Sequence, residues 1–149
     1  MSGQKKLPGR QIYRAGFKDY SRPGKYMITL TAKEGFRGPF CHITGDIDRQ
    51  QVILTDLGQA IQNHIRDLAF YNPFIQLRRL VIMPDHVHFL LQVTRDLVRD
   101  LGSEIAVVKC RCSQSYSKLN NFEKTATLFK DGFNDRIVFT PKQLEILGS

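Results

Sequence analysis

Alternating apolar and polar positions predict most of the strands in this chain. Residues 25–31 (KYMITLT) alternate and include β-branched side chains, which is typical of a strand with one buried face. Residues 40–44 and 51–55 lie on either side of a Gly-Asp turn and predict a β-hairpin. Two more strands are expected at 75–83 and 86–93, with a Pro-Asp pair between them.

Apolar residues spaced by three and four predict two helices. The first follows Thr55, which is placed to cap its first turn, and ends at Asn-Pro-Phe, residues 72–74. Its stripe contains Leu57, Ile61, His64, Ile65 and Leu68, and we interpret His64 as a core residue rather than a ligand. The second helix is predicted over residues 97–120. Its stripe contains Leu97, Leu101, Ile105, Val108, Cys112, Tyr116 and Leu119, and its opposite face carries Lys109, Arg111 and Lys118.

The last segment predicts a loop with a short extended piece, followed by the start of a helix. Residues 128–139 form the loop and extended piece, and then Thr140, Pro141 and Gln143 match an N-cap, a first helical position and a capping box. The chain stops at Ser149, so we expect the sequence to be cut inside an element. The order β-(ββ)-α-β-β-α predicts an α+β fold, with one antiparallel sheet and helices on one of its faces.

Composition excludes several classes of protein. The chain of 149 residues fits one domain, and no apolar run approaches the ~20 residues that span a bilayer, so we expect no membrane association. The N-terminus lacks the apolar segment of a secretory signal. Three cysteines without zinc-ribbon spacing are expected to be ordinary thiols in a reducing compartment, and we expect a cytoplasmic protein.

Positive charge is concentrated near the N-terminus. The net charge is +8, and the first 25 residues hold seven basic side chains and one acidic one. We therefore divide the chain into a basic arm, 1–24, and a folded domain, 25–149. The arm is either a solvated tail or a segment that lies along a phosphate backbone, and charge alone does not decide between these alternatives.

Two histidines lie two residues apart in the apolar strand 86–93. Residues two apart in a strand point to the same side, so His86 and His88 share a face with Leu90 and Gln92, while the other face is uniformly apolar. Two neighbouring imidazoles on a rigid strand can chelate a divalent metal at little reorganisation cost. The alternative is a pair of surface histidines without a role.

The segment VIMPDHVHFLLQV, residues 81–93, closely resembles the HUH motif (His, bulky apolar, His) of single-tyrosine transposases, in particular the REP-associated type. Residues 20–34 and 128–138 resemble that family's first strand and the segment before its catalytic helix. The resemblance implies a ferredoxin-like sheet and cleavage and joining of single-stranded DNA beside a hairpin. It also implies a Mg²⁺ or Mn²⁺ ion held by two histidines and a third polar ligand, and a tyrosine that forms a 5′-phosphotyrosine link. By resemblance, His86 and His88 are the metal ligands.

The family's tyrosine lies on a helix after the segment at 128–138, and here the chain ends as that helix begins. We expect no catalytic tyrosine within the chain, because the remaining candidate, Tyr116, falls on an apolar stripe. A full-length parent would cleave DNA, whereas a degenerate or domesticated copy would only bind single-stranded or hairpin DNA, as a monomer or homodimer. Candidate phosphate contacts are Arg10, Arg14, Lys109, Arg111 and Lys118.

Overall fold

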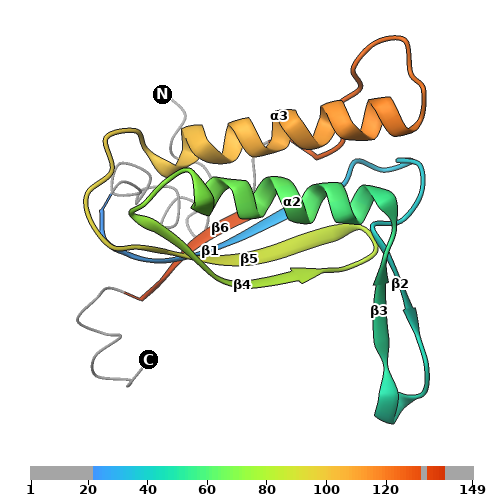
Figure 1. Ribbon diagram of the computed structural model, residues 1–149, viewed down its shortest axis with the longest axis horizontal. Coiled ribbons are helices and arrows are strands. Elements are labelled where there is room, and N and C mark those ends of the chain that lie inside the picture. The colour runs from blue at the N-terminus through green and yellow to red at the C-terminus, as the bar shows by residue number, and fades with distance from the viewer. Residues whose placement is uncertain (1–21, 132–133, 140–149) are drawn as a thin grey trace, which may run out of the picture.

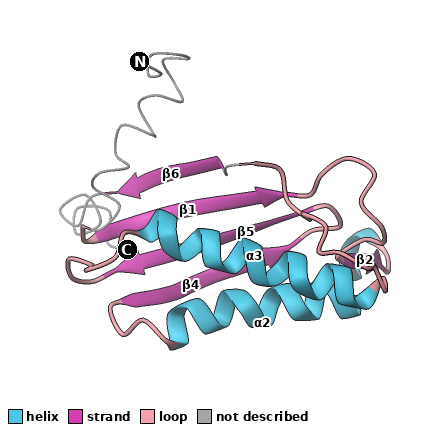
Figure 2. Ribbon diagram, turned by 90° about the horizontal axis from the view of Figure 1, so that it is seen from above, coloured by secondary structure: helices cyan, strands magenta, loops and turns pink. Residues whose placement is uncertain are grey.

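Four antiparallel strands form the central sheet, in the order β4-β5-β1-β6 (Figure 2). The structure is a computed structural model that describes residues 22–131 and 134–139. The strands are β1 (Gly24–Thr31), β4 (Ile75–Ile82), β5 (His86–Val93) and β6 (Asn134–Phe139). Helices α2 (Asp56–Phe70) and α3 (Leu101–Leu119) cover one face of the sheet, as Figures 1 and 2 show. This ferredoxin-like α+β arrangement confirms the predicted fold class.

The two central strands bury every second residue against the helices. Strand β1 does so with Tyr26, Ile28 and Leu30, and β5 does so with alternate residues from Val87 to Val93. The helices contribute the other half of the core with Leu57, Ile61, Ile65, Leu68, Leu101, Ile105, Val108, Cys112 and Tyr116. The strict alternation leaves the opposite face of the sheet uncovered by either helix.

Helix α2 begins where the sequence predicts. The Oγ1 atom of Thr55 accepts a hydrogen bond from the backbone N–H of Gly58 and donates one to the carbonyl of Pro39, at 3.1 and 2.8 Å. A side chain at Gly58 would collide with the carbonyl oxygen of Phe40, so this position needs glycine to let the helix approach the loop residue that precedes β2.

Helix α3 is shorter than predicted. It begins at Leu101 rather than residue 97, because the carboxylate of Asp100 accepts a hydrogen bond from the N–H of Ser103 and caps the helix there. The predicted stripe is also too long, since Leu119 is exposed. In the part of the chain that the structure describes, no helix combines the length and the hydropathy that crossing a bilayer requires. All three cysteines are free thiols.

The predicted hairpin forms, but it does not join the main sheet. Strands β2 (Cys41–Thr44) and β3 (Gln51–Leu54) pair with each other through a tip that contains the 3-10 helix η2 (Ile47–Arg49). We call this element, residues 41–54, the ribbon. It projects from one end of the sheet, on the side away from the helices (Figure 1). The expectation of a single sheet is therefore wrong, because local patterning does not specify which edge a hairpin pairs with.

Candidate metal centre and nucleic-acid interface

His86 and His88 lie side by side on the face of the sheet that the helices leave open. The centroids of the two imidazole rings are 4.6 Å apart, with an angle of 79° between the rings. Between them, Val87 is fully buried on the helix side. The prediction that both imidazoles share the non-core face is confirmed, whereas their role as metal ligands stays a prediction.

Neighbouring oxygens hold both rings at the same nitrogen. The Nδ1 atom of His86 lies 2.8 Å from a carboxylate oxygen of Asp85, and the Nδ1 atom of His88 lies 2.8 Å from the hydroxyl of Thr29. Thr29 is directly opposite His88 in the pairing of β1 with β5. Hydrogen bonds at Nδ1 of this kind orient imidazoles that bind metal through Nε2. Among the described residues, neither Nε2 has a hydrogen-bond partner.

The electrostatics favour a neutral, metal-competent His88. Partial burial lowers the pKa of the His88 imidazole, and the adjacent His86 lowers it further. The hydrogen bond from His86 lowers the pKa of the Asp85 carboxyl, which keeps the carboxylate ionised as an acceptor. Because a proton and a metal ion compete for the same lone pair, a lowered histidine pKa favours metal binding at neutral pH.

The two imidazole nitrogens supply only part of the coordination shell of a divalent ion. Imidazole nitrogens suit Mn²⁺ better than Mg²⁺, which prefers oxygen. Within residues 22–131 and 134–139 there is no group of three or more histidine, cysteine, aspartate or glutamate side chains that could hold a metal. Among the described residues, a third ligand to the pair would therefore be a hydroxyl, an amide or a backbone carbonyl; otherwise it would come from solvent, from a substrate oxygen or from the rest of the chain.

A hollow beside His88 is lined by Arg79, a cationic residue that the sequence analysis did not identify as part of the site. Its walls include Met27, Thr29, Arg79, Val81 and His88. Arg79 is exposed and lies next to Leu90 in the pairing of β4 with β5, where the register shifts between Leu77 and Arg79. A guanidinium near a metal-binding histidine can hold phosphate oxygens. Consecutive arginines at 78 and 79 were a weak sequence signal for this.

Tyr116 lies on the helix side of the sheet, away from the two histidines. It is 5% exposed, and its hydroxyl accepts a hydrogen bond from the backbone N–H of Arg37 at 3.0 Å. Its ring also packs edge-on against Phe122. The interpretation of Tyr116 as a core residue is therefore confirmed.

The predicted phosphate contacts do not form one surface. Arg111 and Lys118 line a groove between α2 and α3, together with His64 and Ser115. Lys109 lies elsewhere on α3, where its ammonium donates a hydrogen bond to the carbonyl of Lys130 at 2.9 Å. The expectation that all three lysine and arginine side chains share a face is wrong, because positions 109 and 111 are about 200° apart around a helix. Arg10 and Arg14, like the predicted helix at Thr140, lie outside the described residues.

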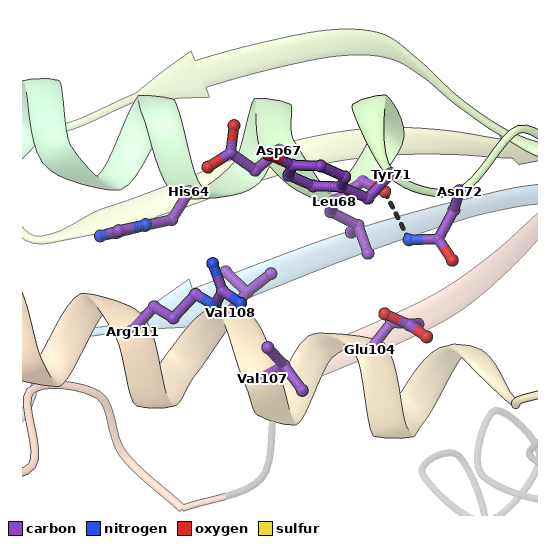
Figure 3. Close-up of a pocket in the computed structure, with 9 residues that line it drawn as sticks. All are labelled: His64, Asp67, Leu68, Tyr71, Asn72, Glu104, Val107, Val108 and Arg111. Atoms are coloured by element: carbon purple, nitrogen blue, oxygen red, sulfur yellow. Dashed lines mark hydrogen bonds between the residues drawn. The ribbon is translucent and has the colours of Figure 1, made fainter.

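A small cavity of about 130 Å³ adjoins this groove and contains His64 (Figure 3). Figure 3 shows Asp67 on the α2 side and Arg111 and Glu104 on the α3 side. The Nε2 atom of His64 lies 2.8 Å from the hydroxyl of Ser115, while its buried Nδ1 has no hydrogen-bond partner in the part of the chain that the structure describes. Burial lowers the pKa of His64; Asp67 raises it and Arg111 lowers it. His64 is thus half-buried between the helices and is not part of the core, so its interpretation as a core residue is wrong.

Comparison with known proteins supports a transposase-like fold. A solved REP-associated tyrosine transposase, bound to a REP hairpin, matches with a TM-score of 0.54 and 13% identity, over 99% of this chain and 68% of that one. A predicted transposase from Deinococcus radiodurans R1 matches with a TM-score of 0.54 and 15% identity, over 99% of this chain and 93% of that one. At these identities the likeness shows the fold alone.

Comparison of the sequence with known proteins gives one match to a protein of unknown function. No family model matches this chain. An uncharacterised protein of Haemophilus influenzae is 29% identical over 84 residues, which is 56% of this chain and 44% of that protein. The chain thus spans less than half of this relative's length.

Proposed function

We propose that this protein is a transposase-like DNA-binding protein that holds a divalent ion and a DNA phosphate on the open face of its sheet. One observation carries the proposal: two imidazoles lie 4.6 Å apart, each hydrogen-bonded at Nδ1 and, among residues 22–131 and 134–139, without a partner at Nε2. The shared fold with a REP-associated tyrosine transposase supports single-stranded or hairpin DNA as the ligand.

The chain's own residues would bind and orient the reacting phosphate. His86 and His88 would hold Mg²⁺ or Mn²⁺, and such an ion polarises a phosphate oxygen and stabilises the charge that develops on it. Asp85 and Thr29 would fix the two rings, and Arg79, which lines the hollow beside His88, would donate hydrogen bonds to phosphate oxygens. Together these groups would position a phosphodiester on the open face of the sheet.

Cleavage also requires a nucleophile on that face. Of the tyrosines in the described part of the chain, Tyr26 and Tyr116 are buried in the core and Tyr71 follows the last turn of α2. Tyr13 and Tyr20 lie outside the described residues. We propose that no tyrosine of the described part reaches that face and that the 149-residue chain binds DNA without forming a covalent link to it. Attack by a tyrosine to give a 5′-phosphotyrosine, as the sequence resemblance implies, would be the activity of a full-length parent.

The two basic regions would contact different stretches of DNA. The sheet separates the groove with Arg111 and Lys118 from the histidine pair, so one short stretch of phosphate backbone cannot reach both. We propose that the groove binds the backbone of a second segment, such as the stem of a hairpin, and that the N-terminal arm adds charge. Each phosphate contact would contribute to the salt dependence of binding.

Calorimetric titration with Mn²⁺ tests the metal site. Wild-type protein should bind one ion weakly, and His86→Ala and His88→Ala should each abolish the signal. His42→Ala is the matched control, because His42 is an exposed histidine on the ribbon that is not part of the pair. An unchanged titration in His88→Ala would refute the metal assignment and leave the alternative, a DNA-binding domain without a metal.

Fluorescence anisotropy with a labelled DNA hairpin and a duplex of random sequence tests the nucleic-acid partner. The hairpin should bind more tightly, with affinity that falls steeply as salt rises, and deletion of residues 1–22 should flatten that dependence. Equal affinity for both DNAs would contradict the proposal. A denaturing gel with Mn²⁺ should show no covalent band for the 149-residue chain; a band abolished by Tyr116→Phe would refute the placement of Tyr116 outside the chemistry.

A further inference from the structure

The ribbon exposes an unusual amount of apolar surface. Ile43, Val52 and Ile53 are 43%, 54% and 51% exposed, and Ile47 at the tip is 90% exposed. Ile43 and Val52 are directly opposite each other across the two strands and share a face with the buried Cys41. An apolar strip therefore runs from the core of the protein outward along one face of the ribbon. Clustered apolar side chains of this kind mark interaction surfaces.

The ribbon also lacks neighbours along its strands. Within the described residues, β2 and β3 pair with each other and with no other strand, so each has a free outer edge. An isolated two-stranded hairpin is marginally stable in water, and a free edge readily pairs with another chain. A partner that covers the apolar strip would stabilise the hairpin by burying this surface.

The charge of the ribbon argues against DNA as that partner. Asp46 and Asp48 flank the exposed Ile47, and with Arg49 they give the ribbon a net charge of −1, whereas the remainder of the chain carries +9. Phosphates would be repelled by this acidic tip, and a basic protein surface would attract it. A second copy of this chain provides two such basic side chains, because exposed Lys33 and Arg37, with the acidic Glu34 between them, lie in the loop that leads into the ribbon.

We propose that the ribbon is a dimerisation arm that packs antiparallel on the same ribbon of a second copy. In a twofold contact the strip formed by Ile43 and Val52 meets itself. Four strand residues reach roughly 13 Å, at about 3.3 Å each, so antiparallel packing brings the acidic tip to the base of the other ribbon. There Asp46 and Asp48 would approach the loop that carries the partner's Lys33 and the partner's Arg37. Apolar surface and charge would both be complementary in this arrangement.

The arm is attached next to the histidine pair. The backbone N–H of Phe40 donates a hydrogen bond to the carbonyl of Pro84, two residues before His86, at 2.8 Å. The thiol of Cys41 lies 3.5 Å from the carbonyl of Ile82. Ribbon pairing would therefore hold two histidine pairs at a fixed separation. The dimer itself does not depend on the proposed function, since it requires neither metal nor DNA.

Sedimentation velocity of the full chain over a wide concentration range tests the dimer. Wild-type protein should dimerise, and Ile43→Thr with Val52→Thr should weaken the dimer by roughly tenfold or more. Threonine keeps the strand preference of the replaced residues, so the ribbon should stay folded. Val98→Thr is the control, because Val98 is fully exposed outside the ribbon and its replacement should change nothing.

A charge exchange tests the antiparallel orientation. Asp46→Lys with Asp48→Lys should weaken the dimer, and the further changes Lys33→Glu and Arg37→Glu should restore it. In a Cys110→Ser background, Val52→Cys should form an intermolecular disulfide under mild oxidation. A wild-type protein that is monomeric at every concentration, or a dimer insensitive to the ribbon variants, overturns the proposal. A monomer whose DNA affinity falls in the ribbon variants would overturn it in favour of a DNA contact.

Discussion

Replacing Thr29 with valine should weaken metal binding without unfolding the protein. The hydroxyl of Thr29 is 2.8 Å from Nδ1 of His88 and is the one protein partner of that nitrogen among the described residues. Valine has nearly the same shape and a high strand preference, so β1 should keep its register with β5. The change leaves the His88 ring free to rotate and to place its proton on either nitrogen.

The expected loss of metal affinity follows from the role of Thr29, which orients the metal-ligating ring of His88. Loss of such a partner typically reduces metal affinity by about 10- to 100-fold, which corresponds to roughly 1.4–2.8 kcal/mol of binding free energy. Mn²⁺ titration calorimetry at neutral pH measures this change, and thermal unfolding confirms that the variant is folded.

Thr31→Val is a closely matched control. Thr31 pairs with His86 as Thr29 pairs with His88, and both threonines are partly exposed on the same face of β1. The Nδ1 atom of His86, however, is held by Asp85 rather than by Thr31. Thr31→Val should therefore bind Mn²⁺ nearly as the wild type does. Equal affinities for wild type and Thr29→Val, or equal losses in both variants, would refute the orienting role of Thr29.

Three further predictions concern the helix layer. Arg111→Ala and Lys118→Ala should each weaken DNA binding and reduce the slope of log affinity against log salt concentration by about 0.7–0.9. Anisotropy titrations measure this slope, and an unchanged slope would exclude the groove as a phosphate site. Burial lowers the pKa of His64, so as the pH falls the unfolded chain binds a proton at this imidazole before the folded chain does. The free energy of unfolding should therefore decrease below about pH 6.5. Urea titrations at pH 7.5 and 5.5 should show a smaller decrease for His64→Gln than for the wild type. Gly58→Ala should destabilise the protein by about 1–3 kcal/mol although alanine favours helices, and a raised Tm would contradict the predicted collision.

The sequence by itself determined which residues of each element face the core. Alternation in 86–93 placed His86 and His88 on one side, and the side chain of Thr55 capped α2 as expected. These features depend on residues close together along the chain, so a local pattern of period two or 3.6 specifies them. The same locality explains the correct interpretation of Tyr116 as a core residue.

Only the tertiary structure decided what surrounds those residues. Thr29 is 59 positions from His88, and the register of β1 against β5 alone brings them together. Arg79 reaches the same hollow through an irregularity in β4 that no periodic pattern contains. The ribbon stands apart from the sheet because pairing partners are chosen over the whole chain. Strand register and edge pairing are long-range properties, because they depend on which distant segments bury their apolar faces together.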